Sequence, residues 1–331
     1  MQYGHIDHVS KPISHIVFGT ATPKMFAAFR SVYGDAPDFE ARLQEAFQLL
    51  DDMYAEGVNC FDCSDHYGEE PLGEWLEARG LHDKVVILTK GAHHNRWRKR
   101  VTDFDILHDA HNSLAKLKTN HLDIYMLHRD DPSVPVGPIV DVLNRLYNAE
   151  AVLLVDDDEG KIGAFGGSNW TVERTEEANN YALKHGLQPF TVASPNFGLA
   201  DQLGDPWGGG CVTISGPENK PDREWYARNN IPVFAYSTMA RGFFSGRLDS
   251  AHPEKAGEVL DEAGMKGYCY PQNFERLRRC EILAKEKGMS VAQIAMAWIF
   301  NQKDLDVYAL TSPVTREMMR TNIAASEIKL T

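Results

Sequence analysis

Short runs of β-branched and apolar residues alternate along the chain with longer amphipathic stretches, and this rhythm constrains the fold more than any other feature. Such alternation is typical of repeated strand-helix units, which arrange their strands in parallel. Eight such runs are present, at Ile16–Thr20, Val58–Asp62, Val85–Lys90, Leu122–His128, Ile162–Ser168, Phe190–Ser194, Pro232–Tyr236 and Val307–Thr311. Eight parallel strands can close on themselves, so we expect an α/β fold, a (β/α)8 TIM barrel.

The amphipathic segments predict the helices that would surround this barrel. They cover Phe39–Glu56, Asp105–Leu117, Pro138–Asn148, Val172–His185, Asp222–Asn230, Asn273–Lys287, Val291–Asn301 and Arg316–Ala325, and a further helix is expected around Glu74. Ser290 and Gln293 have the spacing of a capping box. Gly57, Gly186 and Gly288 stand where helices commonly end in a left-handed residue.

Length and composition favour a globular protein that is long enough to form one α/β barrel. A barrel of this kind needs about 250 residues, and the chain has 331 with no Pro- or Ser-rich linker. We therefore expect residues 1–331 to form a single domain. The cysteines number five, an odd count that argues against a disulfide framework and favours a reducing compartment. No apolar run approaches a membrane span and no signal peptide is evident, so we expect a cytoplasmic protein.

The net charge of −13 argues against nucleic acid or an anionic membrane as a partner. A small molecule is the expected partner, and the sequence does not fix the oligomeric state. An anionic cofactor would need a local cluster of cations or backbone amides to hold it.

Three of the predicted strands deliver ionisable side chains at their carboxyl ends, where parallel barrels keep their chemistry. Asp62 ends the second strand, and Tyr67 follows it in a glycine-closed turn; Lys90 ends the third strand and His128 the fourth. A lysine near the phenol is expected to lower the pKa of Tyr67, while Asp62 neutralises that lysine. Such a group could polarise and protonate a carbonyl, which requires a hydride from elsewhere.

Four connections, residues 21–38, 91–104, 197–221 and 237–272, are too long for simple turns and would open on the same face. Their aromatic residues could line an apolar pocket or merely fix the loops to the barrel rim. These residues are Trp97, Phe197, Trp207, Phe243, Phe244 and Tyr268.

From about Ser14 to the C-terminus the chain resembles the aldo-keto reductase family. The residues that carry the resemblance are the set Asp62, Tyr67, Lys90 and His128, together with Gly19-Thr20, Gly167-Ser168-Asn169 and the segment from Pro232 to Arg247. The resemblance implies NAD(P)H-dependent reduction of an aldehyde or ketone, which could be a sugar or another polar carbonyl. It assigns the role of proton donor to Tyr67.

The same resemblance implies how the cofactor is held. Ser168 and Asn169 would hold the carboxamide, Tyr236 would stack on the nicotinamide, and the backbone from Ser237 through Thr238, Met239 and Arg241 to Gly242 would wrap the pyrophosphate. Gly19, Thr20, Ser194, Ser312, Arg316 and Asn322 complete the expected cofactor-binding set. A GxGxxG turn is missing, as expected of a family that binds the cofactor without a Rossmann unit.

Several positions depart from the family pattern. Ser194 stands where relatives often have a glutamine that contacts the carboxamide. Ser312 and Met318 stand where a lysine and an arginine often grip a 2′-phosphate, which leaves Arg316 as the cation nearby. NADP(H) is the cofactor that the family favours, with NAD(H) as the alternative.

Other departures from the family pattern concern the residues that we expect to contact the substrate. Cys63 to His66 is more polar than usual, and we expect substrate contacts from His66, Trp97 and Trp170. An insertion around residues 149–158 lies between a helix and the fifth strand and should be far from catalysis. The chain ends near Thr331, where many relatives continue over the active site.

Three other functions stay open. Acids and histidines at strand ends also describe metal-dependent hydrolases, but no H-x-H pair occurs and Lys90 would compete with the metal, so we expect no metal. The chain could instead bind nicotinamide as a non-catalytic or regulatory subunit. It could also use a retained NAD(P) to oxidise a sugar transiently.

Overall fold

The protein is a closed barrel of eight parallel strands, seen here in a computed structural model that describes residues 1–148 and 160–330. Every predicted strand is confirmed, with ends that differ by at most two residues. The strands are β3 (Ile16–Gly19), β4 (Cys60–Asp62), β5 (Val86–Gly91), β6 (Leu122–Leu127), β7 (Ile162–Ser168), β8 (Val192–Ser194), β9 (Val233–Ala235) and β10 (Val307–Thr311). β10 pairs with β3 and so closes the barrel.

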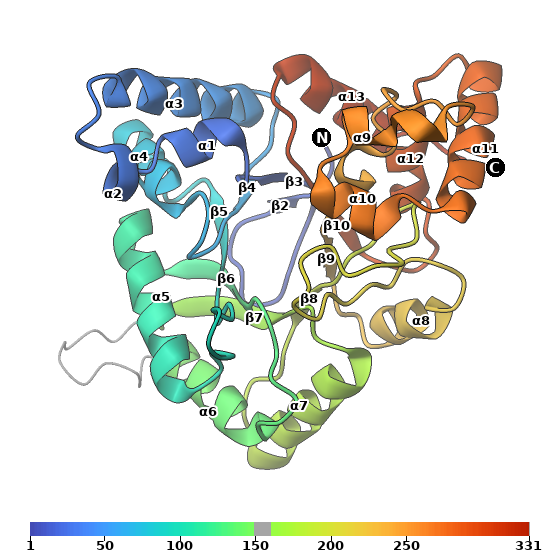
Figure 1. Cartoon of the computed structure of the whole chain (residues 1–331). Coiled ribbons are helices and arrows are strands. Elements are labelled where there is room, and N and C mark those ends of the chain that lie inside the picture. The colour runs from blue at the N-terminus through green and yellow to red at the C-terminus, as the bar shows by residue number, and fades with distance from the viewer. Residues whose placement is uncertain (149–159, 331) are drawn as a thin grey trace.

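Helices ring the strands on the outside (Figure 1). They are α3 (Phe39–Ala55), α4 (Glu69–Arg79), α5 (Asp103–Leu117), α6 (Val136–Tyr147), α7 (Val172–His185), α8 (Lys220–Arg228), α11 (Pro271–Lys287), α12 (Val291–Phe300) and α13 (Arg316–Ser326). Ser290 and Gln293 form the predicted capping box at the start of α12.

Both faces of each strand are buried, which explains why the strands read as continuous apolar runs. In β6, Ile124 and Met126 belong to the cluster inside the barrel. Tyr125 and Leu127, which alternate with them, belong to the cluster between the strands and the helices.

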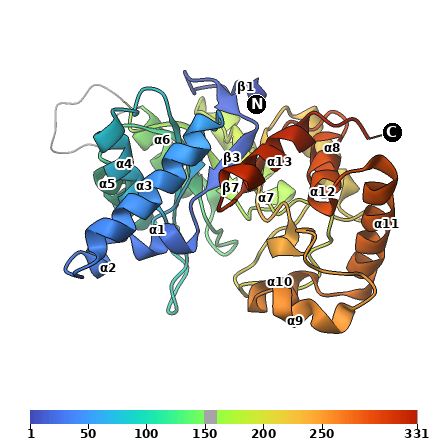
Figure 2. The same cartoon turned by 90° about the horizontal axis from the view of Figure 1, so that it is seen from above.

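An N-terminal hairpin closes the floor of the barrel. Its strands β1 (Tyr3–Gly4) and β2 (Ile13–Ser14) are antiparallel, and Ile6, Val9 and Ile13 pack into the cluster inside the barrel. Lys11 of the hairpin forms an ion pair with Asp123 of β6 at 2.9 Å. No element is predicted for this segment from the sequence. The hairpin lies on the opposite side from α9 (Ala256–Val259) and α10 (Glu262–Tyr268) (Figure 2).

The long loops extend from the carboxyl ends of the strands. The first carries α1 (Pro23–Ala27) and α2 (Arg30–Tyr33), and the loop after β9 carries η1 (Ala240–Gly242), η2 (Pro253–Lys255), α9 and α10. Phe197, Phe243, Phe244 and Tyr268 are almost fully buried in the core clusters. These four aromatic side chains therefore fix the loops to the barrel.

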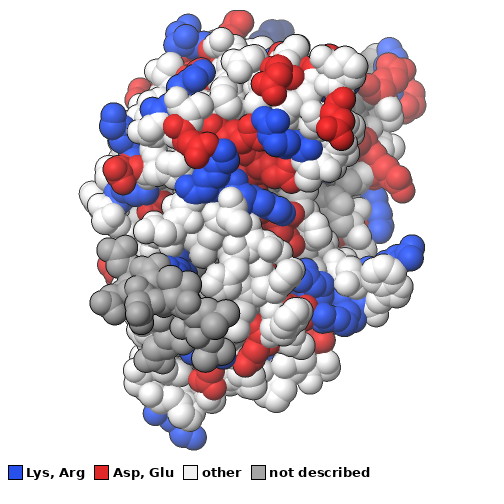
Figure 3. All heavy atoms as spheres, turned by 90° about the vertical axis from the view of Figure 1, so that its left-hand side faces the viewer, with Lys and Arg blue, Asp and Glu red and all other residues white. Residues whose placement is uncertain are grey.

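Acidic and basic side chains lie beside one another over the face formed by α2 to α5 (Figure 3). Among them Arg30 pairs with Glu74 at 2.7 Å, and Arg79 pairs with Asp51 at 2.8 Å. The predicted insertion at 149–158 lies outside the described residues. In the described part of the chain, no helix is long and apolar enough to cross a membrane.

Candidate active site

The four residues predicted at the strand ends come together at the mouth of the barrel. Lys90 Nζ lies 2.8 Å from the hydroxyl of Tyr67 and donates to a carboxylate oxygen of Asp62. The Tyr67 hydroxyl donates to the other oxygen of Asp62 over 3.1 Å. The ring of His128 meets that of Tyr67 edge to face, with 6.1 Å between the ring centroids.

The electrostatics of Tyr67 differ from the expectation. Burial, followed by the negative charge of Asp62, raises the pKa of Tyr67 well above its usual value. The prediction of a lowered pKa for Tyr67 is therefore wrong, because burial and the negative charge of Asp62 outweigh the nearby ammonium of Lys90. Tyr67 consequently remains a protonated acid at neutral pH.

His128 is the neutral partner of this acid. Burial, followed by the nearby charge of Lys90, moves the pKa of His128 well below its usual value. Its Nδ1 atom is buried without a hydrogen-bond partner among the described residues. A neutral imidazole beside a protonated phenol can orient a carbonyl oxygen without adding a charge to the site.

The residues expected to hold the nicotinamide form one connected set. The Tyr236 hydroxyl donates to Asn169 Oδ1 at 2.7 Å, and Asn169 Nδ2 donates to the hydroxyl of Ser168 at 3.2 Å. Ser168 in turn donates to the carbonyl of Ser194 at 3.0 Å. The Ser194 hydroxyl is buried and has no partner in the described structure, so it is available to a ligand amide.

The loop after β9 has a strained backbone. Ser237, Ala240 and Arg241 have φ values of 51°, 48° and 54°, and Gly242 follows with a φ of 98°. A left-handed residue other than glycine costs about 1 kcal/mol or more. The N–H groups of Ala240 and Gly242 donate within the loop to the carbonyls of Ser237 and Met239, at 2.8 and 3.0 Å. A turned backbone of this kind can direct its remaining N–H groups towards an anion such as a pyrophosphate. Thr238 fixes this loop by donating to the carbonyl of Leu310 at 2.8 Å, and half-buried Met239 packs beneath it.

Other residues of the expected cofactor-binding set also form hydrogen bonds. Ser312 donates to the carbonyl of Gly19 at 2.8 Å, and Thr20 donates to the carbonyl of Asp62 at 2.8 Å. Asn322 lies half-buried in α13.

Arg316 already has a carboxylate partner. It lies 2.6 Å from Glu56, and Arg320 approaches the same carboxylate at 2.9 Å. Glu56 is the residue that follows α3 at its carboxyl end. The guanidinium of Arg316 is therefore already engaged by a carboxylate of the protein.

The three expected substrate contacts lie in different surroundings. His66 is exposed and its ring contacts that of His93, 4.5 Å away. Trp97 is 75% exposed in the loop after β5. Trp170 lies in the core against Phe190 and is only 2% exposed, so its ring is withdrawn from the mouth.

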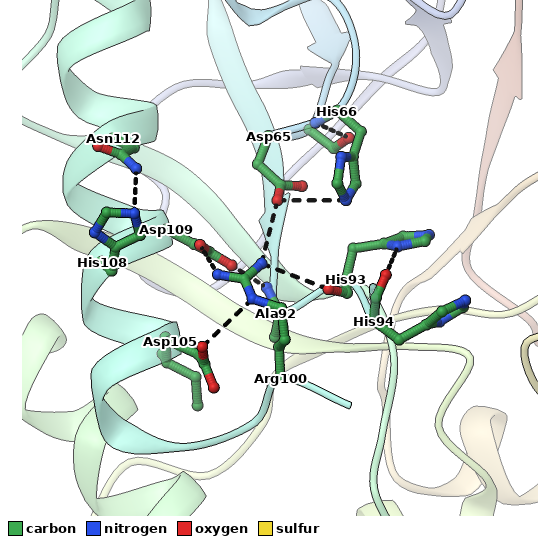
Figure 4. A network of polar contacts seen from close by, with 12 residues as sticks. Asp65, His66, Ala92, His93, His94, Arg100, Asp105, His108, Asp109 and Asn112 are labelled. Atoms are coloured by element: carbon green, nitrogen blue, oxygen red, sulfur yellow. Dashed lines mark hydrogen bonds and ion pairs between the residues drawn. The ribbon is translucent and has the colours of Figure 1, made fainter. Parts of the chain in front are cut away.

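A network of charges fixes the loop after β5 beside the catalytic set (Figure 4). Arg100 of this loop contacts Asp109 at 2.5 Å and Asp105 at 3.3 Å, both on α5. It also reaches Asp65 at 3.9 Å. His93 is held in this loop with its ring 4.7 Å from that of His128, and burial lowers the pKa of His93 to about 4. Among the residues that the structure describes, no cluster of His, Cys, Asp or Glu could hold a metal ion.

Comparison with known proteins agrees with this geometry. The family model described as "Aldo/keto reductase family" matches residues 38–331, and the chain belongs to this family. It is similar to aldo-keto reductase YhdN of Bacillus subtilis, with 25% identity over 76% of this chain and 70% of the relative. It is also similar to the probable aryl-alcohol dehydrogenase AAD4 of Saccharomyces cerevisiae, with 26% identity over 87% and 84%.

A third relative is the aryl-alcohol dehydrogenase [NADP(+)] of Phanerodontia chrysosporium, 32% identical over 45% of this chain and 40% of the relative. Family membership identifies the chain as an oxidoreductase of the NAD(P)-dependent type.

Proposed function

We propose that this protein reduces an aldehyde or ketone to an alcohol with NAD(P)H and that Tyr67 is the proton donor. The observation that carries the proposal is the contact of the Tyr67 hydroxyl with Lys90 at 2.8 Å beside His128. This contact lies at the carboxyl end of the barrel, where enzymes of this fold carry out their chemistry.

The chain's own residues have distinct tasks in this reaction. His128 orients the carbonyl oxygen towards the phenol of Tyr67. As negative charge develops on that oxygen, the phenol turns its proton from Asp62 to the substrate, and Lys90 stabilises the phenolate that remains. Asp62 keeps the ammonium in place. The nicotinamide, when bound, supplies the hydride.

The residues at the mouth suit such a cofactor. Ser194 offers a buried hydroxyl without a partner among the described residues, and Asn169 and Tyr236 belong to the same connected set. The turned backbone from Ser237 to Gly242 would contribute the N–H groups that it does not use within the loop. Family membership and the name of the fungal relative support NADP(H), with NAD(H) as the alternative.

We predict weak discrimination between the two cofactors. Arg316 is paired with Glu56, so a 2′-phosphate would gain little from it. A dedicated charged hydrogen bond is worth about 1.5–3 kcal/mol. Without it, the kcat/KM values for NADPH and NADH should differ by less than about tenfold, or about 1.4 kcal/mol. Initial rates with each cofactor measure this ratio, and a preference of a hundredfold for either one would contradict the prediction.

Replacing the phenol tests the assignment of the proton donor. Tyr67→Phe should lower kcat by about 10²–10⁴-fold, since it removes a positioned general acid. Cofactor affinity should change little, because the hydroxyl contacts Lys90 and Asp62 rather than the segments expected to bind nicotinamide. The measurement follows nicotinamide absorbance with a panel of aryl aldehydes, ketones and aldoses, and cofactor binding by fluorescence.

Two outcomes would overturn the proposal. Full activity in Tyr67→Phe would remove Tyr67 from the chemistry. Cofactor binding by the wild type without turnover of any carbonyl would favour a nicotinamide-binding subunit or an enzyme with a retained cofactor. We propose a small carbonyl or sugar-like molecule in the cytoplasm as the partner, with no role for nucleic acid or membranes.

A further inference from the structure

Arg129 is a buried cation without a carboxylate partner in the described part of the protein. It directly follows His128 and is 5% exposed. Its Nη1 donates to the carbonyl of His128 at 3.0 Å, and Nη2 faces the sulfur of Cys211 at 3.9 Å. Its Nε atom is buried and has no acceptor.

The acids around Arg129 already have partners of their own. Asp130 accepts from Arg174 at 3.0 Å through Oδ2, while its Oδ1 is buried without a partner in the described structure. Asp131 lies 3.5 Å from Lys99. Asp205 accepts four backbone N–H groups of its own loop, at distances of 2.8–3.3 Å. None of these carboxylates lies within ion-pair distance of Arg129, so its charge is unmatched among the described residues.

The position of Arg129 is next to the proposed hydride-transfer site. The carbonyl of His128 accepts both from Arg129 and from Asn169 Nδ2, the latter at 3.3 Å. Asn169 in turn binds the hydroxyl of Tyr236. A ligand that contacts Arg129 would therefore lie beside His128 and Tyr236.

An unmatched buried charge is costly, because burial removes its hydration and nothing replaces it. The free atoms of Arg129 are Nε and, apart from the distant sulfur, Nη2. These two nitrogens form one edge of the guanidinium, which binds the two oxygens of a carboxylate side by side. The geometry therefore matches a planar anion.

We infer that Arg129 binds a carboxylate of the substrate, so that the preferred substrate is an oxo acid whose carbonyl lies at Tyr67 and His128. This inference rests on the proposed function, which fixes the place of the carbonyl. The pyrophosphate of the cofactor is the other source of an anion, and the turned backbone of residues 237–242 already suits it. Arg129 is thus the specificity-determining cation of the substrate site.

The first experiment compares matched acids and neutral analogues as substrates. The pairs are 4-formylbenzoate with its methyl ester, and succinic semialdehyde with butanal. The wild type should favour the acid in at least one pair by about tenfold or more in kcat/KM, or about 1.4 kcal/mol. Arg129→Met should lower that acid-to-neutral ratio by at least about tenfold, and Arg129→Lys should restore part of it.

Lys99→Met is the matched control. Lys99 is a cation of the same face whose side chain is 51% exposed and pairs with Asp131. Its loss should leave the acid-to-neutral ratio within about twofold, because an exposed charge is screened. If Lys99→Met and Arg129→Met lowered the acid-to-neutral ratio equally, the preference for acids would come from the general electrostatic field of this face rather than from a binding site. That result would overturn the inference.

The second experiment measures binding without turnover. Benzoate, but not benzamide, should raise the melting temperature of the wild type, and Arg129→Met should lose this shift while its circular dichroism stays unchanged. Arg129→Lys provides the same comparison if the methionine variant does not fold.

The outcomes separate the two proposals. A benzoate shift that needs Arg129, with no carbonyl reduced, would refute the reductase function and keep the anion site. Reduction of acids and neutral analogues at equal rates in both pairs would refute the anion site and keep the reductase. A weaker cofactor affinity in Arg129→Met with an unchanged acid-to-neutral ratio would assign Arg129 to the pyrophosphate and overturn the inference.

Discussion

Asp65 shows at the scale of a single residue how burial changes the chemistry of a side chain. It follows the catalytic strand end, and its Oδ1 atom is buried without a partner among the described residues. Arg100 lies 3.9 Å from its carboxylate and already binds Asp109 (Figure 4). Burial, followed by the charges of Asp109 and Glu69, raises the pKa of Asp65 to about 7.

This shift makes the stability of the protein depend on pH. The pKa of an unfolded aspartate is about 3.9, so the folded state binds more protons at Asp65 between about pH 4 and pH 7. The contribution of protonated Asp65 to the free energy of unfolding is fully present below about pH 4, and it is lost as the pH rises through about 7. Asp65→Asn should therefore be more stable than the wild type at pH 8 by about 1–3 kcal/mol, with a much smaller difference at pH 4.5.

Urea unfolding of both proteins across this pH range measures the difference. Asp83→Asn, at an exposed aspartate, serves as the control and should show no such trend. A difference between Asp65→Asn and the wild type that stays constant with pH would contradict the assignment.

At the scale of elements, the close approach of neighbouring helices depends on small residues. Gly73 lies buried in α4 where this helix meets α5, and a Cβ atom there would overlap the backbone of Lys116 and Leu117. Gly257 of α9 is exposed, and a Cβ atom there would meet nothing within 4 Å. The same substitution should thus have opposite effects at the two positions.

Gly73→Ala should destabilise the protein by about 1–3 kcal/mol, because backbone atoms cannot move aside as a flexible side chain can. Gly257→Ala should stabilise α9 by about 0.5–1 kcal/mol, because alanine loses less conformational freedom in a helix than glycine. Chemical unfolding of the two variants tests both signs. A neutral Gly73→Ala would show that α4 and α5 separate easily.

At the scale of the whole molecule, the N-terminal hairpin completes the interior of the barrel. Ile13 is fully buried, and it packs with residues from several strands. The hairpin should therefore unfold together with the barrel instead of detaching by itself.

Ile13→Ala should lower the free energy of unfolding by about 2–5 kcal/mol, through lost burial and the cavity left behind. The transition should remain single, with far-UV and near-UV circular dichroism coinciding. Cofactor affinity should be kept, because the hairpin lies on the opposite side from the loop after β9. Separate transitions would show that the hairpin is an independent unit.

Much of the fold can be predicted from the sequence, because the hydrophobic periodicity of helices and strands and the residues that end helices are local signals along the chain. β7 matched its predicted range of Ile162–Ser168, and α7 matched Val172–His185. Gly186 and Gly288 take the left-handed conformation that ends their helices. The hairpin was missed because two-residue strands carry no periodic signal, and its burial depends on strands far along the chain.

The candidate site likewise has features that the sequence predicts and features that it does not. The sequence by itself determined which ionisable groups stand at strand ends, since parallel strands of a barrel bring all their carboxyl ends to one face. Only the tertiary structure decided their charge states and partners. Burial and the charge of Asp62 raise the pKa of Tyr67, and Glu56 at the end of α3 engages Arg316 of α13. Arg129 has no carboxylate partner among the described residues. Charge and burial depend on neighbours in space, which a pattern along the chain does not specify.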